Sequence, residues 1–127
     1  MKKSFLLMIA CFTFFSYSPV KATTEAKNEI QLRDDLIYIL LTPFIDKEIE
    51  KHYGELKQYY CGTILQIKKL EQGSFYFDVT VQVTTFEGAH NPPNDLVTIT
   101  FSNHHYPGWR TVDFKNRRLK PNEEICR

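Results

Sequence analysis

The chain has 127 residues, of which 43% are hydrophobic, and its 16 Lys and Arg against 15 Asp and Glu give a formal net charge of +1. This length predicts one domain, small enough that a covalent cross-link would help its stability noticeably. The near balance of charge argues against bulk nucleic-acid binding and against strong electrostatic steering of a charged partner.

Residues 1–22 have the order of a secretory signal peptide. Lys2 and Lys3 give a positive start, an apolar run follows over residues 5–15, and residues 20–22 are small or compact at the positions that a signal peptidase reads. The apolar run is about 11 residues long, shorter than the roughly 20 that a membrane-spanning helix needs. We therefore expect cleavage after Ala22, a secreted or extracytoplasmic protein, and no transmembrane segment in the mature chain.

Two alternatives stay open for this leader. In the first, the leader is kept as an uncleaved anchor. In the second, it is cut before Cys11 to give a lipoprotein, although Met8 is atypical for such a site and the apolar run continues past the cysteine. Cleavage after Ala22 removes three lysines, which leaves 13 basic against 15 acidic residues and a mature net charge of −2.

The mature chain is expected to begin with a flexible polar lead-in over 23–28, followed by a single domain over 29–127. Apolar or half-polar side chains then recur with helical spacing at Ile30, Ile37, Leu41, Phe44, Ile45, Ile49, His52 and Tyr53. Pro43 suits the first turn of a helix with Thr42 as its cap. The pattern predicts a helix near 30–41, a break or kink, and a helix near 43–53 that ends at Gly54.

After Gln58 the hydrophobic period changes to two. Strands are predicted over 64–70, 75–85, 97–102 and 110–114, with turns at 71–73 and at Pro107-Gly108. Each strand has one apolar face, and the other face is rich in threonine. The short links make the strands an antiparallel meander.

Together these elements predict an α+β fold. The N-terminal helical region, kinked or divided into two helices, would pack on one face of a four-stranded antiparallel meander sheet. This plan is loosely cystatin-like, and a likeness of that kind carries no function.

Two cysteines remain after the leader, Cys61 and Cys126. Outside the cytoplasm such a pair favours a disulfide, which would stabilise the fold by roughly 4 kcal/mol on the loop-entropy model. Two free thiols are the alternative, because a sequence does not show whether the two Cα atoms come within bridging distance.

The loop over residues 86–95 is the most unusual segment. Gly88 permits a tight turn, and Pro92-Pro93 stiffens the chain after it. Such a loop can hold side chains in a fixed array, and the candidate binding residues are Glu87, Gly88, His90, Asn91 and Asp95. The plainer interpretation is a hairpin connection, because one histidine and two acids match no motif with a required spacing.

Other polar groups give weaker hypotheses. His104 and His105 follow a strand, where adjacent residues point to opposite faces, so we expect that they do not bind one ion together. Trp109 is expected to close the end of the core. A basic tail of Lys115, Arg117, Arg118 and Lys120 is interpreted as a solvated end, with contact to an anionic wall polymer or to lipid headgroups as the alternative.

No catalytic residue, metal site or cofactor is assigned from the sequence, which has no nucleophile elbow, P-loop, zinc-protease, dinucleotide or EF-hand motif. The first hypothesis is a non-enzymatic extracellular or cell-surface binding module whose partner is a surface protein or a wall polymer. A metal- or ligand-dependent enzyme that uses the His90 loop is the alternative.

Three short segments resemble a known family: Leu-Leu-x-Pro at 40–43, Gly-x-His at 88–90 and Val-Asp-Phe-Lys at 112–115. The chain is similar over residues 32–115 to small exported bacterial proteins, chiefly of Gram-positive spore formers, classed as domain of unknown function 3888. The resemblance implies a signal peptide, and it brings no known activity, substrate or cofactor. It does not imply the cysteine pair, so the predicted disulfide rests on this sequence alone.

Overall fold

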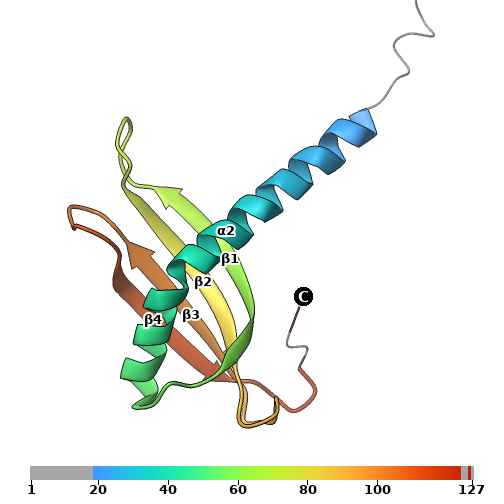
Figure 1. The fold of residues 1–127 in the computed structure, drawn as a ribbon, viewed down its shortest axis with the longest axis vertical. Helices are drawn as coiled ribbons and strands as arrows, with labels where there is room; N and C mark the ends of the chain where they lie inside the picture. Colours follow the sequence, from blue (N-terminus) through green and yellow to red (C-terminus); the bar gives the residue numbers. More distant parts are fainter. Residues whose placement is uncertain (1–18, 124–125, 127) are drawn as a thin grey trace, which may run out of the picture. The chain divides into compact units, whose positions relative to one another are not determined.

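The computed structural model describes residues 19–123 and 126, so the expected signal peptide lies mostly outside the described residues. The chain falls into two compact units that meet between Leu32 and Arg33. The elements are α2 (Pro19–Tyr53), β1 (Tyr59–Lys69), β2 (Phe77–Thr85), β3 (Asp95–Ser102) and β4 (Arg110–Arg118), as Figure 1 shows. From Arg33 onward they form the predicted α+β fold, with one helix packed on an antiparallel sheet of order β1-β2-β3-β4.

The helix α2 runs through Pro43 without the break that was one of the two predictions for this point. The Thr42 hydroxyl donates to the Tyr38 carbonyl at 3.2 Å, one turn back, rather than capping a new helix. Figure 1 shows α2 bending where it lies over the sheet, as a proline inside a helix produces. Residues 23–28, expected as a flexible polar lead-in, belong to α2, and their flexibility stays a prediction.

The helix ends at Gly54, as predicted. Its φ of 75° lies in the left-handed region, and its N–H donates to the Glu50 carbonyl at 2.8 Å. This is the geometry of a left-handed C-cap, which satisfies one of the carbonyls left free at the end of a helix.

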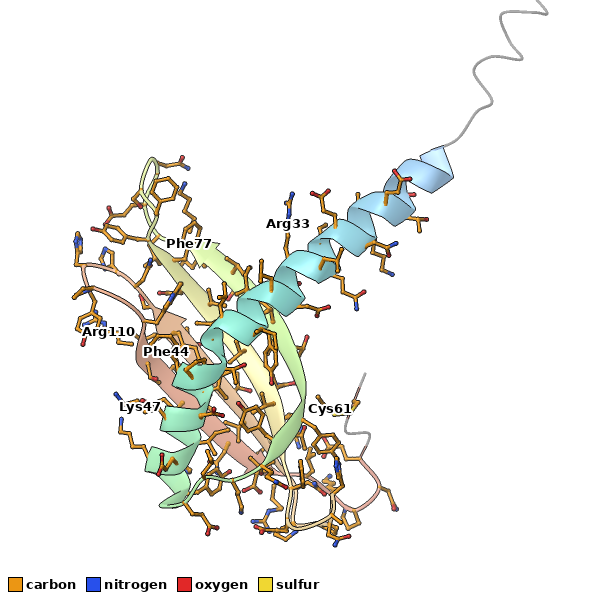
Figure 2. The ribbon with its side chains drawn as sticks, viewed as in Figure 1. Arg33, Phe44, Lys47, Cys61, Phe77 and Arg110 are labelled. Atoms are coloured by element: carbon orange, nitrogen blue, oxygen red, sulfur yellow. A yellow bond between two sulfur atoms is a disulfide. The ribbon has the colours of Figure 1, made fainter. Side chains whose placement is uncertain are left out.

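The core lies between α2 and the central strands. Leu41, Ile45 and Ile49 recur every four residues along α2, so they share one face, and each is at most 2% exposed. They pack on the alternate residues of β2 and β3, which are Val79, Val81, Val83, Val97, Ile99 and Phe101. Phe44 adds an edge-to-face contact with Phe101 at 6.3 Å between ring centroids, and Figure 2 shows it on the helix above the strands.

The strand boundaries differ from the prediction at the two edges of the sheet. β1 begins at Tyr59, five residues before the predicted start. Extra residues around Cys61 and Leu65 interrupt its alternation, so a search for a period of two did not find its first part. β4 continues to Arg118, so most of the expected basic tail is strand. The pairing of β2 with β3 keeps one register throughout.

The face of the sheet opposite α2 is polar, as the alternation predicted. Thr80 and Thr100 share a hydrogen bond of 3.0 Å, and Gln82 donates to Thr98 at 3.2 Å. α2 is the only helix among residues 19–123 and 126, so no helix in that part of the chain covers this face. Within the same residues, no helix has the length and apolar character needed to cross a membrane.

The structure joins Cys61 to Cys126 in a disulfide. Their Cα atoms are 5.4 Å apart, inside the usual range for bridged cysteines. Cys61 has a φ of 56° and lies in the irregular part of β1, where Figure 2 labels it. The structure therefore supports the predicted pairing.

Candidate functional site

Two hairpin tips lie at the same end of the sheet. In a meander of order β1-β2-β3-β4, the β1–β2 turn and the β3–β4 turn share one end, whereas the β2–β3 loop lies at the other. The first tip carries Glu71 and Tyr76, and the second carries His104 and His105. Residues 28 to 34 positions apart in the sequence therefore become neighbours.

Asn103 joins the two tips. Its side-chain oxygen accepts the N–H of Phe77 at 2.7 Å, and its side-chain nitrogen donates to the carbonyl of Phe75 at 2.9 Å. One side chain on the β3–β4 tip thus satisfies two backbone groups of the β1–β2 tip. These two hydrogen bonds across the tips limit how far the tips can move apart.

The first turn is also closed on itself. Ser74 donates from its hydroxyl to the carbonyl of Glu71 at 3.0 Å, and the N–H of Leu70 donates to the carbonyl of Tyr76 at 2.9 Å. These bonds define the backbone from which the Glu71 side chain leaves the tip.

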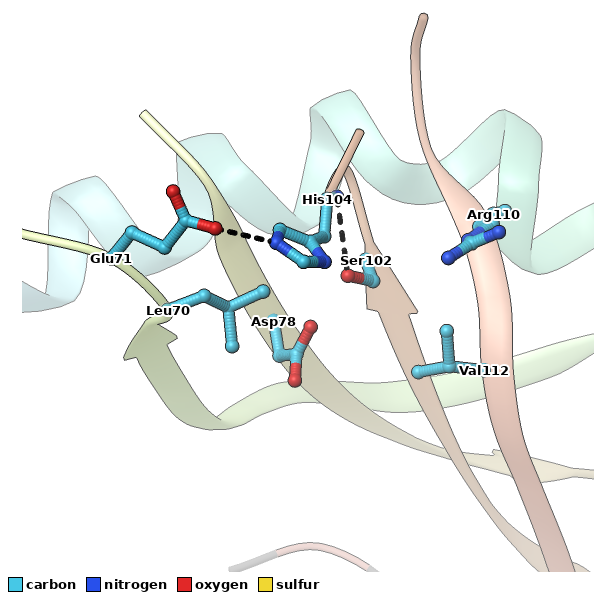
Figure 3. Close-up of a pocket in the computed structure, with 7 residues that line it drawn as sticks. All are labelled: Leu70, Glu71, Asp78, Ser102, His104, Arg110 and Val112. Atoms are coloured by element: carbon cyan, nitrogen blue, oxygen red, sulfur yellow. Dashed lines mark hydrogen bonds and ion pairs between the residues drawn. The ribbon is translucent and has the colours of Figure 1, made fainter. Parts of the chain in front are cut away.

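Glu71, His104 and His105 form a cluster at these tips, and we call it the Glu71–His104–His105 cluster. The Nε2 atom of His104 lies 2.7 Å from Oε1 of Glu71, and the Nε2 atom of His105 lies 3.5 Å from the same oxygen. One donor atom from each of the three side chains falls within 4.8 Å of the other two. Figure 3 shows the contact between His104 and Glu71 as a dashed line.

The prediction that His104 and His105 point apart is wrong. It assumed that both residues continue the strand, but β3 ends at Ser102 and the two histidines lie in the turn that follows. His105 has a φ of 50°, outside the strand region, and the two ring centroids are 4.1 Å apart.

Aromatic packing and one backbone bond orient the two imidazoles. The Tyr76 ring lies 5.2 Å from that of His104 and 4.8 Å from that of His105. The backbone N–H of His104 donates to the hydroxyl of the buried Ser102 at 3.3 Å. The cluster is therefore supported from the first tip and from the end of β3.

A depression of about 460 Å³ adjoins the cluster on the polar side of the sheet (Figure 3). Its lining combines two acids, an imidazole, a guanidinium and a hydroxyl with two apolar side chains, namely Leu70, Glu71, Asp78, Ser102, His104, Arg110 and Val112. The depression is open to solvent, and its polar groups give it charged walls of both signs.

The predicted binding loop lies at the opposite end of the sheet, and its side chains are engaged separately. Glu87 pairs with Lys57 at 2.6 Å and exchanges two backbone hydrogen bonds of 2.8 Å with Asn91. The exposed ring of His90 stacks on Phe86, with centroids 4.3 Å apart.

Asp95, the last residue of that predicted set, is buried and bonded elsewhere. Its carboxylate accepts the Tyr53 hydroxyl at 2.9 Å and the Nε–H of Arg118. Burial raises the pKa of Asp95, but the hydrogen bonds from Arg118 and Tyr53 outweigh it and hold the pKa below its ordinary value of 3.8. This carboxylate therefore belongs to an internal network.

The structure also shows where Trp109 and the predicted basic tail lie. Trp109 packs against the core, as expected. The charges of the predicted basic tail are largely paired, since Lys115 meets Asp113 at 2.8 Å, Arg117 meets Glu123, and Arg118 meets Asp95. Three of the four basic side chains of this segment thus lie beside an acid, and contact with an anionic polymer stays a prediction.

No local pattern in the sequence predicts that Glu71 lies beside the histidines, and this residue was expected only in a turn. Its partners are 33 and 34 residues away, and only the strand order brings them together. The one available sequence indication was that His104 and His105 follow the last alternating residue of a strand. Beyond that residue, adjacent side chains need not point to opposite faces.

Comparison with known proteins finds one similarity. A family model described as "Protein of unknown function (DUF3888)" matches residues 33–117. No curated protein and no solved structure shows a significant match.

Proposed function

The chain belongs to the DUF3888 family of proteins of unknown function, and from this premise we propose that it is an exported, non-enzymatic binding module. Its ligand is taken at the end of the sheet that carries the Glu71–His104–His105 cluster. The observation that carries the proposal is the convergence of two hairpin tips, joined by Asn103, on a depression with charged and polar walls.

Export has separate support. The order of the leader is that of a secretory signal, and a cysteine pair within bridging distance suits an oxidising compartment. Sequencing the N-terminus of the protein recovered from the culture medium or the cell surface tests it. We expect a start at Thr23; a start at Cys11 would show a lipoprotein, and recovery only from the cytoplasm would contradict export.

Binding is tested by capture from intact cell surfaces and culture medium. The wild-type chain is compared with a Glu71→Gln/His104→Ala/His105→Ala variant and with His90→Ala. We expect the triple substitution to abolish recovery of the bound component and His90→Ala to leave it unchanged. The reverse result would place the contact on the loop at 87–95, which stays a prediction of its own.

The alternative, a metal- or ligand-dependent enzyme that uses the His90 loop, has less support. Glu87, His90 and Asp95 each have a separate partner, so a proton relay among them would first require those contacts to break.

A further inference from the structure

We propose that the ligand held by the Glu71–His104–His105 cluster is a divalent transition-metal ion of the zinc, copper and nickel group. This inference rests on the proposed function only in placing a ligand at this end of the sheet. The metal would be bound by Nε2 of His104, Nε2 of His105 and one carboxylate oxygen of Glu71.

The donor set selects this class of metal. Two imidazole nitrogens and one carboxylate oxygen suit zinc, copper and nickel, whereas calcium and magnesium prefer sites built from oxygen atoms alone. Two histidines with one glutamate are also a ligand set of zinc sites that keep a coordination position open.

The distances fit such an ion with small adjustments. Ligand atoms about 2.1 Å from a tetrahedral zinc ion lie roughly 3.4 Å from one another. The separation of His105 Nε2 from Glu71 Oε1 is 3.5 Å, and all three donor atoms lie within 4.8 Å. The contact of 2.7 Å between His104 and Glu71 must open by roughly 0.7 Å, which side-chain rotation supplies.

The short contact between His104 and Glu71 indicates where the metal would sit. In the metal-free protein a proton on Nε2 of His104 bridges to the carboxylate. A metal ion takes the place of that proton and satisfies the same two atoms. An ordinary ion pair would use only one histidine, whereas here His105 directs its Nε2 to the same oxygen.

The site is prepared by the groups around it. Asn103 holds the tips together, the Tyr76 ring packs on both imidazoles, and the left-handed backbone of His105 turns its ring toward its neighbour. Outer partners that fix ligand orientation are a regular feature of metal sites. The side chain of His105 is 65% exposed, so the remaining coordination positions stay open to water or to a second ligand in the depression.

The first test is calorimetric titration of the purified chain, free of any histidine tag, with zinc chloride. We expect one ion per chain. Glu71→Gln, His104→Ala and His105→Ala should each weaken the affinity by more than the roughly 10–100-fold typical for loss of an outer partner. His52→Ala removes an exposed histidine whose ring rests on Phe114, and it serves as the matched control with unchanged affinity.

A spectroscopic test counts the ligands. With one equivalent of copper(II), the electron paramagnetic resonance spectrum should show coupling to two imidazole nitrogens in the wild-type chain. The same spectrum should show one in His104→Ala and in His105→Ala. Thermal unfolding of each variant without metal checks that the fold is kept.

Three results would overturn the metal site: no saturable binding of zinc, binding that the triple substitution leaves unchanged, or a copper spectrum that the histidine substitutions do not alter. The two proposals fail separately. Zinc binding by a chain that is never exported would contradict the proposed function alone. Capture that depends on the cluster without any metal affinity would contradict the metal site alone.

Discussion

Gly62 shows how closely the helix and the first strand approach each other. A Cβ atom built at this residue would lie 2.0 Å from Cζ of Tyr38 and 2.2 Å from Cε2. The half-buried Tyr38 ring therefore occupies the space that any larger residue at 62 would need. At residue 62 a glycine is needed because the Tyr38 ring leaves no room for a side chain, whereas at residue 54 a glycine is favoured because φ is positive.

Replacing Gly62 with alanine should lower the free energy of unfolding by about 1–3 kcal/mol, because a well-packed contact must shift to admit the methyl group. Urea denaturation measures the change, with Thr63→Ala on the exposed neighbouring residue as the control. In a Gly62→Ala/Tyr38→Leu double variant the loss of stability should be smaller than the sum of the losses in the two single variants, since the obstructing ring is gone. Full additivity would contradict the contact.

Asp95 gives a prediction about pH. Arg118 and Tyr53 lower the pKa of Asp95 in the folded state. Its contribution to stability is therefore present above pH 3.8, the ordinary pKa of the carboxyl group, and is lost as the pH falls through the lower pKa of the folded state. Asp95→Asn should cost about 1–2 kcal/mol at pH 7, the lower part of the range for bonds to a charged group because Arg118 is largely exposed.

Urea denaturation at pH 7 and at pH 3 checks this prediction. The difference between wild type and Asp95→Asn should shrink at the lower pH, where the wild-type carboxyl group is increasingly protonated. Asp113→Asn removes the acid of a more exposed ion pair with Lys115, and it should change stability by less than about 1 kcal/mol. Equal effects of the two substitutions would contradict a special role for Asp95.

At the scale of elements, the side chain of Asn103 makes two of the hydrogen bonds that join the two hairpin tips. Asn103→Ala removes both bonds to the first tip, whereas Asn103→Asp keeps an acceptor for the N–H of Phe77 and loses the donor to Phe75. Hydrogen bonds of this kind contribute about 0.5–1.5 kcal/mol each. The alanine variant should therefore be destabilised more than the aspartate variant.

The same pair of variants tests how the tips position the cluster. We expect zinc affinity to fall by roughly 10–100-fold in Asn103→Ala, because the histidines and Glu71 are then carried by separate loops. Titration by calorimetry measures it, and the copper spectrum should still show two nitrogens, since no ligand has been removed. Loss of one nitrogen signal would show that Asn103 does more than position the tips.

The elements show which parts of this molecule a sequence can predict. The strands β2 and β3 alternate without interruption, so their inward faces follow directly from Val79, Val81, Val97 and Ile99. Local rules fail at Pro43, where α2 continues although proline favours the start of a helix, and at His105, whose backbone leaves the strand region beyond β3. The contact of Glu71 with His104 depends on strand order and turn geometry together, which no local pattern contains.

At the scale of the whole molecule, the disulfide fastens the C-terminal segment to β1 across 65 residues. Reduction, or Cys126→Ser, should lower the free energy of unfolding by up to roughly 4 kcal/mol, because the unfolded chain regains the freedom that the closed loop removes. Urea denaturation with and without reductant measures this loss. The Cys126→Ser variant is its own control, since reductant should no longer change its stability.

Intact mass of the secreted form gives an independent measurement of the same bond. The oxidised chain should be lighter than the reduced chain by about two hydrogen atoms, since forming the bond removes one from each thiol. Alkylation of both cysteines without reductant would contradict the disulfide.

The irregular pairing of the sheet is confined to its outer strands. Extra residues interrupt β1 near Cys61 and Leu65 and β4 at Val112, whereas β2 and β3 stay in register. An open sheet offers two unpaired edges to any passing chain, and bulges and charged side chains make such edges poor templates for further strands. Lys68 and Lys69 lie on one edge strand and Arg117 and Arg118 on the other, so we expect charge and bulges together to make both edges poor partners for the strand of another chain.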